Sequence, residues 1–218
     1  RGAFQGMIAR YRLGQPPLPA SLPPSRGGAP ESRINVFVRS RPLLSDELRG
    51  GGFDVITCDA AEVGGGLILH EPKVLVDLSK AMDNHHYKFD GVFGHASTNE
   101  QIYQTALRPM VQHLFNTRGG HGTCFAYGQT GSGKTFTMLG DMNNYVHRGV
   151  APRALAHVFA DVAARIETQY TVVCTYMEIY NERIFDLLED VSIEQDQGKF
   201  NIVEDKGGHG TFVRGLRK

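Results

Sequence analysis

The sequence predicts an α/β fold in which a central, mostly parallel β-sheet carries helices on both faces. Two observations support this prediction. A glycine-rich loop follows a short apolar run at 124–127 and precedes residues that can open a helix. In chain order, short strands are followed by a helix, then by this strand–loop–helix unit, and then by a long strand. At 218 residues the chain is long enough for a sizeable core.

The glycine-rich loop carries the clearest chemistry. Residues 128–135 read GQTGSGKT and match G-x-x-x-x-G-K-[ST] at every fixed position. Glycines let backbone N–H groups converge on a phosphate, because no Cβ blocks the approach. Lys134 adds a full charge for the outer phosphates, and Thr135 offers a hydroxyl to a bridging Mg²⁺. We therefore predict a P-loop NTPase-type fold with the nucleotide at the end of a buried strand at 124–127.

Residues 1–33 are predicted to form a short helix followed by a linker. Phe4, Met7, Ile8 and Tyr11 recur at helical spacing, whereas the prolines and glycines between residues 16 and 28 prevent regular structure. A disordered tail is the alternative interpretation.

The next segment predicts a strand at 34–38, followed by Arg39-Ser40-Arg41-Pro42. Two arginines and a proline at a strand end can wrap a planar base, although spacing alone favours a solvated loop. Further strands are predicted at 54–58, 67–69, 74–76 and 88–93. Residues 97–100 match a capping box, and Pro109 predicts a kink in the helix that this box opens.

After the glycine-rich loop, polar residues 139–149 are predicted to interrupt a helix that resumes near Pro152. The predicted buried face of this helix comprises Ala154, Leu155, Val158, Phe159, Val162 and Ile166. A long strand at 171–180 and an apolar run at 184–188 follow. Two short strands, 200–203 and 211–213, flank a turn at Gly207-Gly208.

The amino-acid composition limits the kinds of partner that the chain is expected to bind. The chain carries 23 basic and 23 acidic residues, so we expect no overall attraction to nucleic acid. No apolar run approaches membrane-spanning length, and no membrane partner is expected. The three cysteines lie far apart, and the histidines of the repeated GGHGT segments lack a second ligand at useful spacing. We therefore predict a reduced intracellular protein with no metal beyond magnesium.

Four segments together resemble the kinesin motor domain over about residues 34–218. They are INVFVRSRPL, YKFDGVFG, TCFAYGQTGSGKTFTM and YMEIYNERIFDLL, in the family's order. Four further segments resemble those of the kinesin-13 group: LHEPKVLVDLSK, TNEQIY, RPMVQHLF and FQGMIARYR. The last of them resembles the end of that group's neck helix. The resemblance divides the chain into a neck-helix end and Pro/Gly-rich linker at 1–33 and the N-terminal part of a motor domain at 34–218.

The resemblance implies an ATP- and Mg²⁺-dependent, microtubule-stimulated ATPase. Arg39 and Pro42 would flank the adenine, and Phe136 would stack on it. The phosphates would lie on Gly128, Gln129, Thr130, Gly131, Ser132, Gly133 and Lys134, with Thr135 on the magnesium. The segment around Lys73, Val76 and Asp77 would contact tubulin, and the hairpin at 200–218 would also face the microtubule. The expected location is the cytoplasm and its microtubule cytoskeleton.

Two departures from the family pattern limit what the resemblance implies. Kinesin-13 proteins usually carry Lys-Val-Asp at the tip of the tubulin-contacting loop, whereas this chain has Leu75-Val76-Asp77. The family's switch motifs are expected beyond Lys218, so no catalytic residue is assigned within the chain. A translocating kinesin and a non-catalytic microtubule-binding scaffold remain the alternatives. Any homodimer would form through segments outside this sequence.

Overall fold

A computed structural model describes residues 2–14, 34–59, 65–117, 119–188, 200–204 and 211–217. The chain divides into two compact units, residues 1–164 and 165–218, which are considered separately below. The predicted linker and the Gly207-Gly208 turn lie outside the described residues. In the described part of the chain, no helix is both long and apolar enough to cross a membrane.

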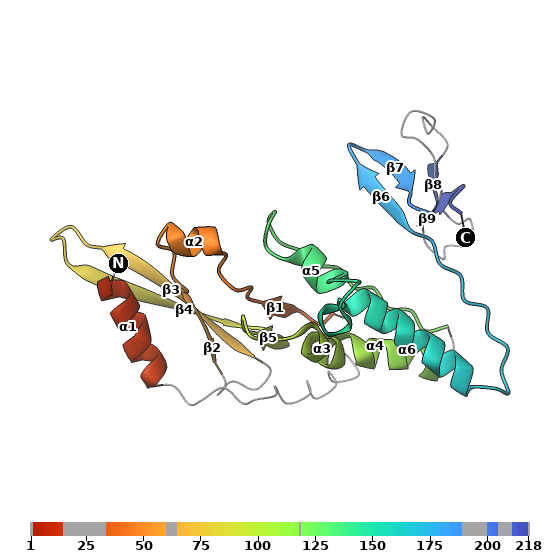
Figure 1. Ribbon diagram of the computed structural model, residues 1–218, viewed down its shortest axis with the longest axis horizontal. Helices are drawn as coiled ribbons and strands as arrows, with labels where there is room; N and C mark the ends of the chain where they lie inside the picture. Colours follow the sequence, from red (N-terminus) through yellow and green to blue (C-terminus); the bar gives the residue numbers. More distant parts are fainter. Residues whose placement is uncertain are drawn as a thin grey trace. The chain divides into compact units, whose positions relative to one another are not determined.

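The first unit begins with helix α1 (Gly2–Leu13), as the apolar spacing predicted. This helix lies against a three-stranded antiparallel sheet of β2 (Ile56–Asp59), β3 (Gly66–Val74) and β4 (Lys80–Lys88), in the order β2-β3-β4 (Figure 1). Ile8 is the buried residue of α1, and the ring of Tyr11 meets that of His70 edge-on at 5.0 Å. The predicted apolar stripe is therefore the face that packs on the sheet.

Polar contacts connect the end of α1 to the same sheet. Arg12 pairs with Asp54 at 2.9 Å and donates from Nε to Thr57 Oγ1 at 2.9 Å. Thr57 Oγ1 lies 2.8 Å from His70 Nε2, and His70 Nδ1 lies 2.6 Å from Asn84 Oδ1. Since an amide oxygen only accepts, Nδ1 carries the proton, and in neutral His70 Nε2 accepts from the Thr57 hydroxyl. Helix and sheet thus share one continuous chain of hydrogen bonds.

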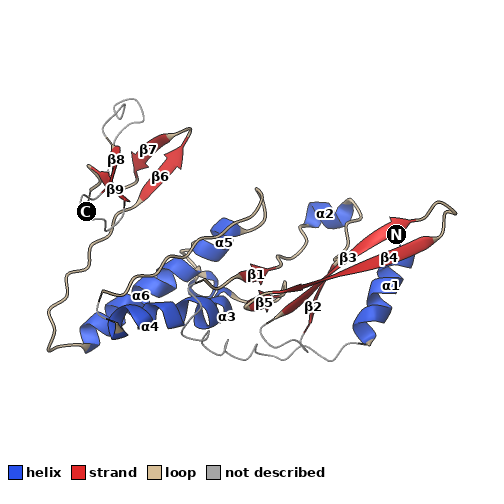
Figure 2. Cartoon of the chain, turned by 180° about the vertical axis from the view of Figure 1, so that it is seen from behind, coloured by secondary structure: helices blue, strands red, loops and turns tan. Residues whose placement is uncertain are grey.

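The strand prediction was incomplete in this sheet. Instead of separate strands at 67–69 and 74–76, the structure has one nine-residue strand, β3, paired along its whole length with β4 (Figure 2). β4 was not predicted, because its side chains are mostly exposed and it lacks the apolar alternation of a half-buried strand. In the turn between the two strands, Leu78 has a φ of 65°, which is strained for a residue with a γ-branched side chain.

A second, parallel pair of strands lies beside the main core. β1 (Phe37–Arg39) pairs with β5 (Gly91–Phe93), and Arg39 lies opposite Phe93. Helix α2 (Ser45–Arg49) follows β1. The core cluster comprises Phe93, Ile102, Tyr103, Leu107 and Val150. It joins the end of β5 to the helices described next.

These helices begin with α3 (Asn99–Ile102), continue through a π-helical turn at Tyr103–Leu107, and end with α4 (Arg108–Asn116). The capping box lies one residue later than predicted, with Thr98 as the cap and Gln101 as its partner. The π turn occupies the place of the predicted kink. An α-helical turn there would bring the Pro109 ring against the carbonyl of residue 105, and the wider turn relieves that clash.

The helix after the glycine-rich loop is interrupted, as predicted. It consists of α5 (Lys134–Met138), a loop with a 3₁₀ turn at Tyr145–His147, and α6 (Val150–Ala164). Pro152 lies in the first turn of α6, where a missing N–H costs no helical bond. The predicted buried face was partly wrong, because Leu155 and Phe159 are exposed and Ile166 lies beyond the helix.

The predicted buried strand at 124–127 was also wrong. Residues 121–129 take no strand pairing, and Phe125 and Tyr127 are 81% and 96% exposed. A strand exists only through hydrogen bonds to a neighbour. Within the described residues of the first unit, β1 and β5 pair with each other and no ladder reaches this segment.

Among its described residues, the second unit contains two antiparallel pairs of strands. β6 (Met177–Tyr180) pairs with β7 (Arg183–Asp186) across a turn at Asn181 and Glu182, both with positive φ. The predicted strand at 171–180 is thus shorter than expected. β8 (Asn201–Glu204) pairs with β9 (Thr211–Arg214), as predicted. Buried Asp186 accepts from the backbone N–H of Leu188 and Arg217 at 2.9 and 2.6 Å.

Candidate nucleotide-binding site

A cavity of about 230 Å³ lies in the first unit where β1 ends and α3 and α5 begin. Roughly 300–1,000 Å³ is usual for a pocket that encloses a whole drug-sized ligand, so this volume suits one heterocycle better than an entire nucleotide. The segment 139–149 closes part of the rim through Val146 and His147. The lining comprises Arg39, Arg41, Pro42, His95, Ala96, Ser97, Thr98, Asn99, Ser132, Gly133, Phe136, Thr137, Val146 and His147.

Arg39 is the central cation of the cavity. Its guanidinium Nη1 donates to Asn99 Oδ1 at 2.7 Å and to Thr137 Oγ1 at 2.8 Å, and its Nη2 donates to Ser97 O at 3.1 Å. Its Cζ also lies 5.2 Å from the centre of the Phe136 ring, in cation–π range. Partial burial lowers the pKa of Arg39, but an arginine stays charged at neutral pH. The strand end therefore presents a fixed positive group beside an aromatic face.

Phe136 and Pro42 supply the apolar surfaces of the cavity. Phe136 follows Thr135 in α5, and its ring is partly exposed and lies 6.4 Å from that of His147. An aromatic ring and a proline beside a hydrogen-bonded cation suit a flat, apolar heterocycle with polar edges. The structure thus brings Arg39, Pro42 and Phe136, three of the predicted nucleotide-binding residues, to one cavity.

The corner after Pro42 is held by an ion pair. Arg41 contacts Glu47 through two hydrogen bonds, at 2.8 and 2.5 Å, and Glu47 also accepts from the Leu44 N–H at 2.7 Å. These bonds, chiefly those from Arg41, lower the pKa of Glu47 to about 2. The pair fixes the direction in which the chain leaves the cavity.

The glycine-rich loop adjoins this cavity. Gly131 and Gly133 have φ values of 80° and 95°, which residues with a Cβ rarely adopt. Gly133 is also the residue that precedes the first turn of α5. The Lys134 ammonium donates to the carbonyls of Gly128 and Gln129 at 2.8 and 3.0 Å. Because an ammonium has three donors, it can hold the loop closed and still bind one more oxygen.

The predicted site residues divide into two groups. Arg39, Pro42, Ser132, Gly133 and Phe136 line the cavity, whereas Gly128, Gln129, Thr130, Gly131, Lys134 and Thr135 form the loop beside it. The exposed Thr135 side chain at the start of α5 could supply one oxygen ligand to a magnesium ion. Among the described residues, no cluster of three or more His, Cys, Asp or Glu side chains could hold a metal alone.

Asn99, which is only 3% exposed, is a cavity residue that was not predicted from the sequence. Its side-chain NH₂ donates to Phe136 O at 3.0 Å and to His147 O at 3.2 Å, while its oxygen accepts from Arg39. The residue had been interpreted only as an inner position of the predicted capping box. No local sequence pattern indicates this role, because the partners of Asn99 at residues 39, 136 and 147 are distant in sequence.

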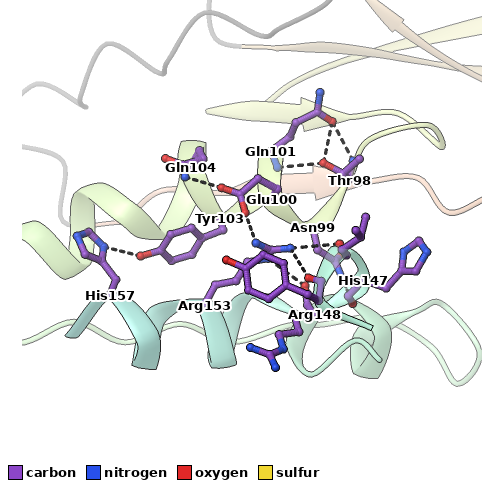
Figure 3. A network of polar contacts seen from close by, with 12 residues as sticks. Thr98, Asn99, Glu100, Gln101, Tyr103, Gln104, His147, Arg148, Arg153 and His157 are labelled. Carbon is purple, nitrogen blue, oxygen red and sulfur yellow. Dashed lines mark hydrogen bonds and ion pairs between the residues drawn. The ribbon is translucent and has the colours of Figure 1, made fainter. Parts of the chain in front are cut away.

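A second polar cluster fixes the segment 145–148 at the rim of the cavity (Figure 3). Arg153 of α6 pairs with Glu100 and donates to the carbonyls of Tyr145, Val146 and Arg148 at 3.1–3.2 Å. Glu100 also accepts from Gln104 at 2.5 Å. One arginine thus satisfies three loop carbonyls and connects them to helix α3.

Comparison with known proteins identifies the family. A family model described as the kinesin motor domain matches residues 39–218. The chain belongs to the kinesin motor domain family. Its similarity to a solved kinesin, described as "Structure of a fast kinesin: Implications for ATPase mechanism and interactions with microtubules", has a TM-score of 0.65 at 30% identity. That match covers 84% of this chain and 47% of the solved one, and it confirms the α/β, P-loop NTPase-type fold.

Two curated kinesin-like proteins are also similar. Kinesin-like protein KLP1 of Chlamydomonas reinhardtii is 40% identical over 185 residues, which cover 84% of this chain and 22% of KLP1. Kinesin-like protein KIF24 of Homo sapiens is 40% identical over 157 residues, which cover 72% of this chain and 11% of KIF24. The kinesin chain described here therefore spans less than a quarter of either relative.

The kinesin residues predicted to contact tubulin lie at the far end of the β3–β4 hairpin. Val76 is fully exposed, and Asp77 accepts from the backbone and hydroxyl of Ser79 at 3.0 and 2.6 Å. Lys73 pairs with Asp83 at 2.5 Å and lies 3.4 Å from Glu71, so its charge is partly neutralised within the hairpin. The outermost side chains, Val74, Leu75, Val76 and Leu78, are apolar and exposed.

Proposed function

We propose that this kinesin chain binds Mg·ATP as part of a microtubule-stimulated ATPase. The observation that carries the proposal is the juxtaposition of two surfaces. A cavity lined by Arg39, Pro42 and Phe136 shares two of its lining residues, Ser132 and Gly133, with the glycine-rich loop. A ligand with a flat heterocycle at one end and a chain of phosphates at the other matches both surfaces at once.

In this proposal the base lies against Phe136 and Pro42, and the phosphates follow the loop. The backbone N–H groups of the loop and the Lys134 ammonium would neutralise the phosphates, which suits their spread negative charge. Helix α5 has only five residues, so its dipole contributes little compared with these groups. Thr135 would supply one oxygen to a Mg²⁺ ion, whose charge would help to neutralise the phosphates. This chain's residues bind and orient the nucleotide; none is assigned to activate the attacking water.

The proposal is tested by Lys134→Ala in the full-length protein. Loss of a charge-assisted contact to phosphate should weaken Mg·ATP binding by about 10- to 100-fold, measured by titration calorimetry. Lys80→Ala is the matched control, because Lys80 lies on β4, where its ammonium contacts the Phe4 ring at 5.6 Å. Equal ATP affinity in the wild type and Lys134→Ala would refute the proposal.

We further propose that the protein destabilises microtubules in the manner of the kinesin-13 group. The supporting features are the segments at 69–80, 98–103 and 108–115, and helix α1 at the position of a neck-helix end. In this assignment residues 1–33 are neck and linker and 34–218 belong to the motor domain. The β3–β4 hairpin would contact tubulin through the residues around Lys73, Val76 and Asp77, and its apolar tip would replace the usual lysine.

Stabilised microtubules with ATP separate the alternatives. A destabilising kinesin shortens the filaments, and a translocating kinesin leaves their length unchanged. A non-catalytic scaffold sediments with microtubules without microtubule-stimulated ATP turnover. Val76→Ser should reduce shortening while leaving ATP affinity unchanged, because Val76 lies at the hairpin tip and does not line the cavity. Shortening at the wild-type rate by this variant would contradict a contact at the tip.

A further inference from the structure

We infer that Asn99 is a positioning residue that shapes the base-binding half of the cavity and so sets affinity for the nucleotide's base without holding its phosphates. This inference rests on the nucleotide-binding function proposed above. Asn99 is buried, and its side chain connects three separate elements that surround the cavity: the end of β1, the first turn of α5 and the segment 139–149.

Both side-chain N–H groups of Asn99 are paired within the protein. The oxygen accepts from Arg39, and the two N–H groups donate to the carbonyls of Phe136 and His147. An arginine can only donate and a carbonyl can only accept, so chemistry fixes the orientation of the amide. Both amide hydrogens are used within the protein. Asn99 therefore acts on a bound base through its neighbours.

Each partner of Asn99 has a defined place in the cavity. The guanidinium of Arg39 lies over the Phe136 ring, and the backbone of Phe136 is itself fixed by Asn99. The carbonyl of His147 holds the rim segment that closes the cavity. One buried amide thus sets the distance between the aromatic surface, the cation and the rim. None of these bonds reaches Lys134 or Thr135, which are predicted to meet the phosphates and magnesium.

The chemistry of the side chain is specific at this position. Aspartate keeps an acceptor for Arg39 but directs an anionic oxygen at the carbonyls of Phe136 and His147, which repels both and removes two donors. The substitution conserves size, so it tests the hydrogen bonds without leaving a cavity. Asn143→Asp is the matched control, because it places the same charge on an exposed residue of the segment 139–149.

The experiment measures the ATPase of the full-length protein with Mg·ATP and uses inorganic tripolyphosphate as a competitive inhibitor. Asn99→Asp should raise the KM for ATP about tenfold, leave kcat within twofold, and leave the inhibition constant of tripolyphosphate unchanged. Asn143→Asp should change none of the three. The split between ATP and tripolyphosphate is the readout that a general loss of structure would not give.

Three results would overturn the inference. An unchanged KM would show that Asn99 does not shape the base site. Equal losses for ATP and tripolyphosphate would show a disturbance of the whole site, and a fall in kcat at constant KM would place Asn99 in the chemical step. If the wild-type protein has no ATPase and tripolyphosphate has nothing to inhibit, the proposed function fails first, and the inference fails with it.

Discussion

The cavity and the β3–β4 hairpin are both rich in polar contacts, but they use them differently. At the cavity, Arg39 and Asn99 connect residues 37 to 98 positions apart, and the contacts are partly shielded from water. Along the hairpin, Glu71, Lys73, Asp83 and His85 pair across two neighbouring strands, with side chains 41–51% exposed. The first set of contacts fixes tertiary structure. The second set adds little, because backbone hydrogen bonds already hold the two strands together.

Among the substitutions that test this contrast, we expect Arg153→Ala to lower stability most. The Arg153 side chain is only 9% exposed, and its loss removes the ion pair with Glu100 and one hydrogen bond from each of three loop carbonyls. We expect the free energy of unfolding to fall by about 2–3 kcal/mol, measured by urea denaturation. Arg49→Ala removes an exposed pair with Asp46 and should leave the midpoint unchanged. Similar losses in the two variants would erase the contrast.

A smaller effect is expected where β2 pairs with the buried half of β3, at the base of the hairpin. Thr57→Val keeps the shape of Thr57 but removes the hydroxyl that lies between Arg12 and His70. The loss should cost about 1–2 kcal/mol and should increase hydrogen exchange in helix α1. Ser79→Ala at the exposed tip, where Ser79 contacts Asp77, is the control. Unaltered exchange in α1 would mean that this chain of hydrogen bonds does not hold the helix.

At the outer part of the hairpin, Lys73→Ala should hardly change the free energy of unfolding. The main cause of the raised pKa of Lys73 is its hydrogen bond with Asp83. Because the pair is open to water and screened by salt, it should contribute little to stability. We expect the urea midpoint to stay within experimental error at both 0.05 M and 1 M salt, values chosen to span about 14 Å to 3 Å of screening length. A clear, salt-dependent loss would show that this ladder holds structure.

The last prediction concerns pH near the cavity. Its bonds to Arg41 lower the pKa of Glu47 to about 2 from an ordinary value of 4.5. A lowered carboxyl pKa means that the pair stabilises the fold above pH 4.5 and is lost as pH falls toward 2. Carbon-detected NMR should give a Glu47 midpoint near pH 2, and Arg41→Gln should return it toward 4.5. A wild-type midpoint at the ordinary value would show that the corner is not held by this pair.

The sequence predicted the local parts of the fold best. The stripe on α1, the interruption at 139–149 and the hairpin of β8 and β9 follow from spacing and turn residues, and the structure confirms them. β4 was missed because an exposed strand has no apolar period. The segment 124–127 was wrongly assigned because apolar composition indicates a strand but cannot supply the neighbour that a strand needs.

The candidate site shows the same division. The phosphate loop is a contiguous motif, and family resemblance supplied Arg39, Pro42 and Phe136, which the structure brings to one cavity. Asn99 has partners at residues 39, 136 and 147, a relationship that no local pattern records. The capping box shows that a shift of one residue changes the direction in which the following side chains point. With Thr98 as the cap, Asn99 turns toward the cavity and Glu100 toward Arg153.

The open segment at 121–127 leads directly into Gly128, where the phosphate loop begins. Its backbone forms no ladder with the described residues, and Phe125 and Tyr127 are largely exposed. The loop that follows is closed by its own lysine, because the Lys134 ammonium contacts the carbonyls of Gly128 and Gln129. A substitution at Lys134 therefore removes a contact that closes the loop as well as a positive charge.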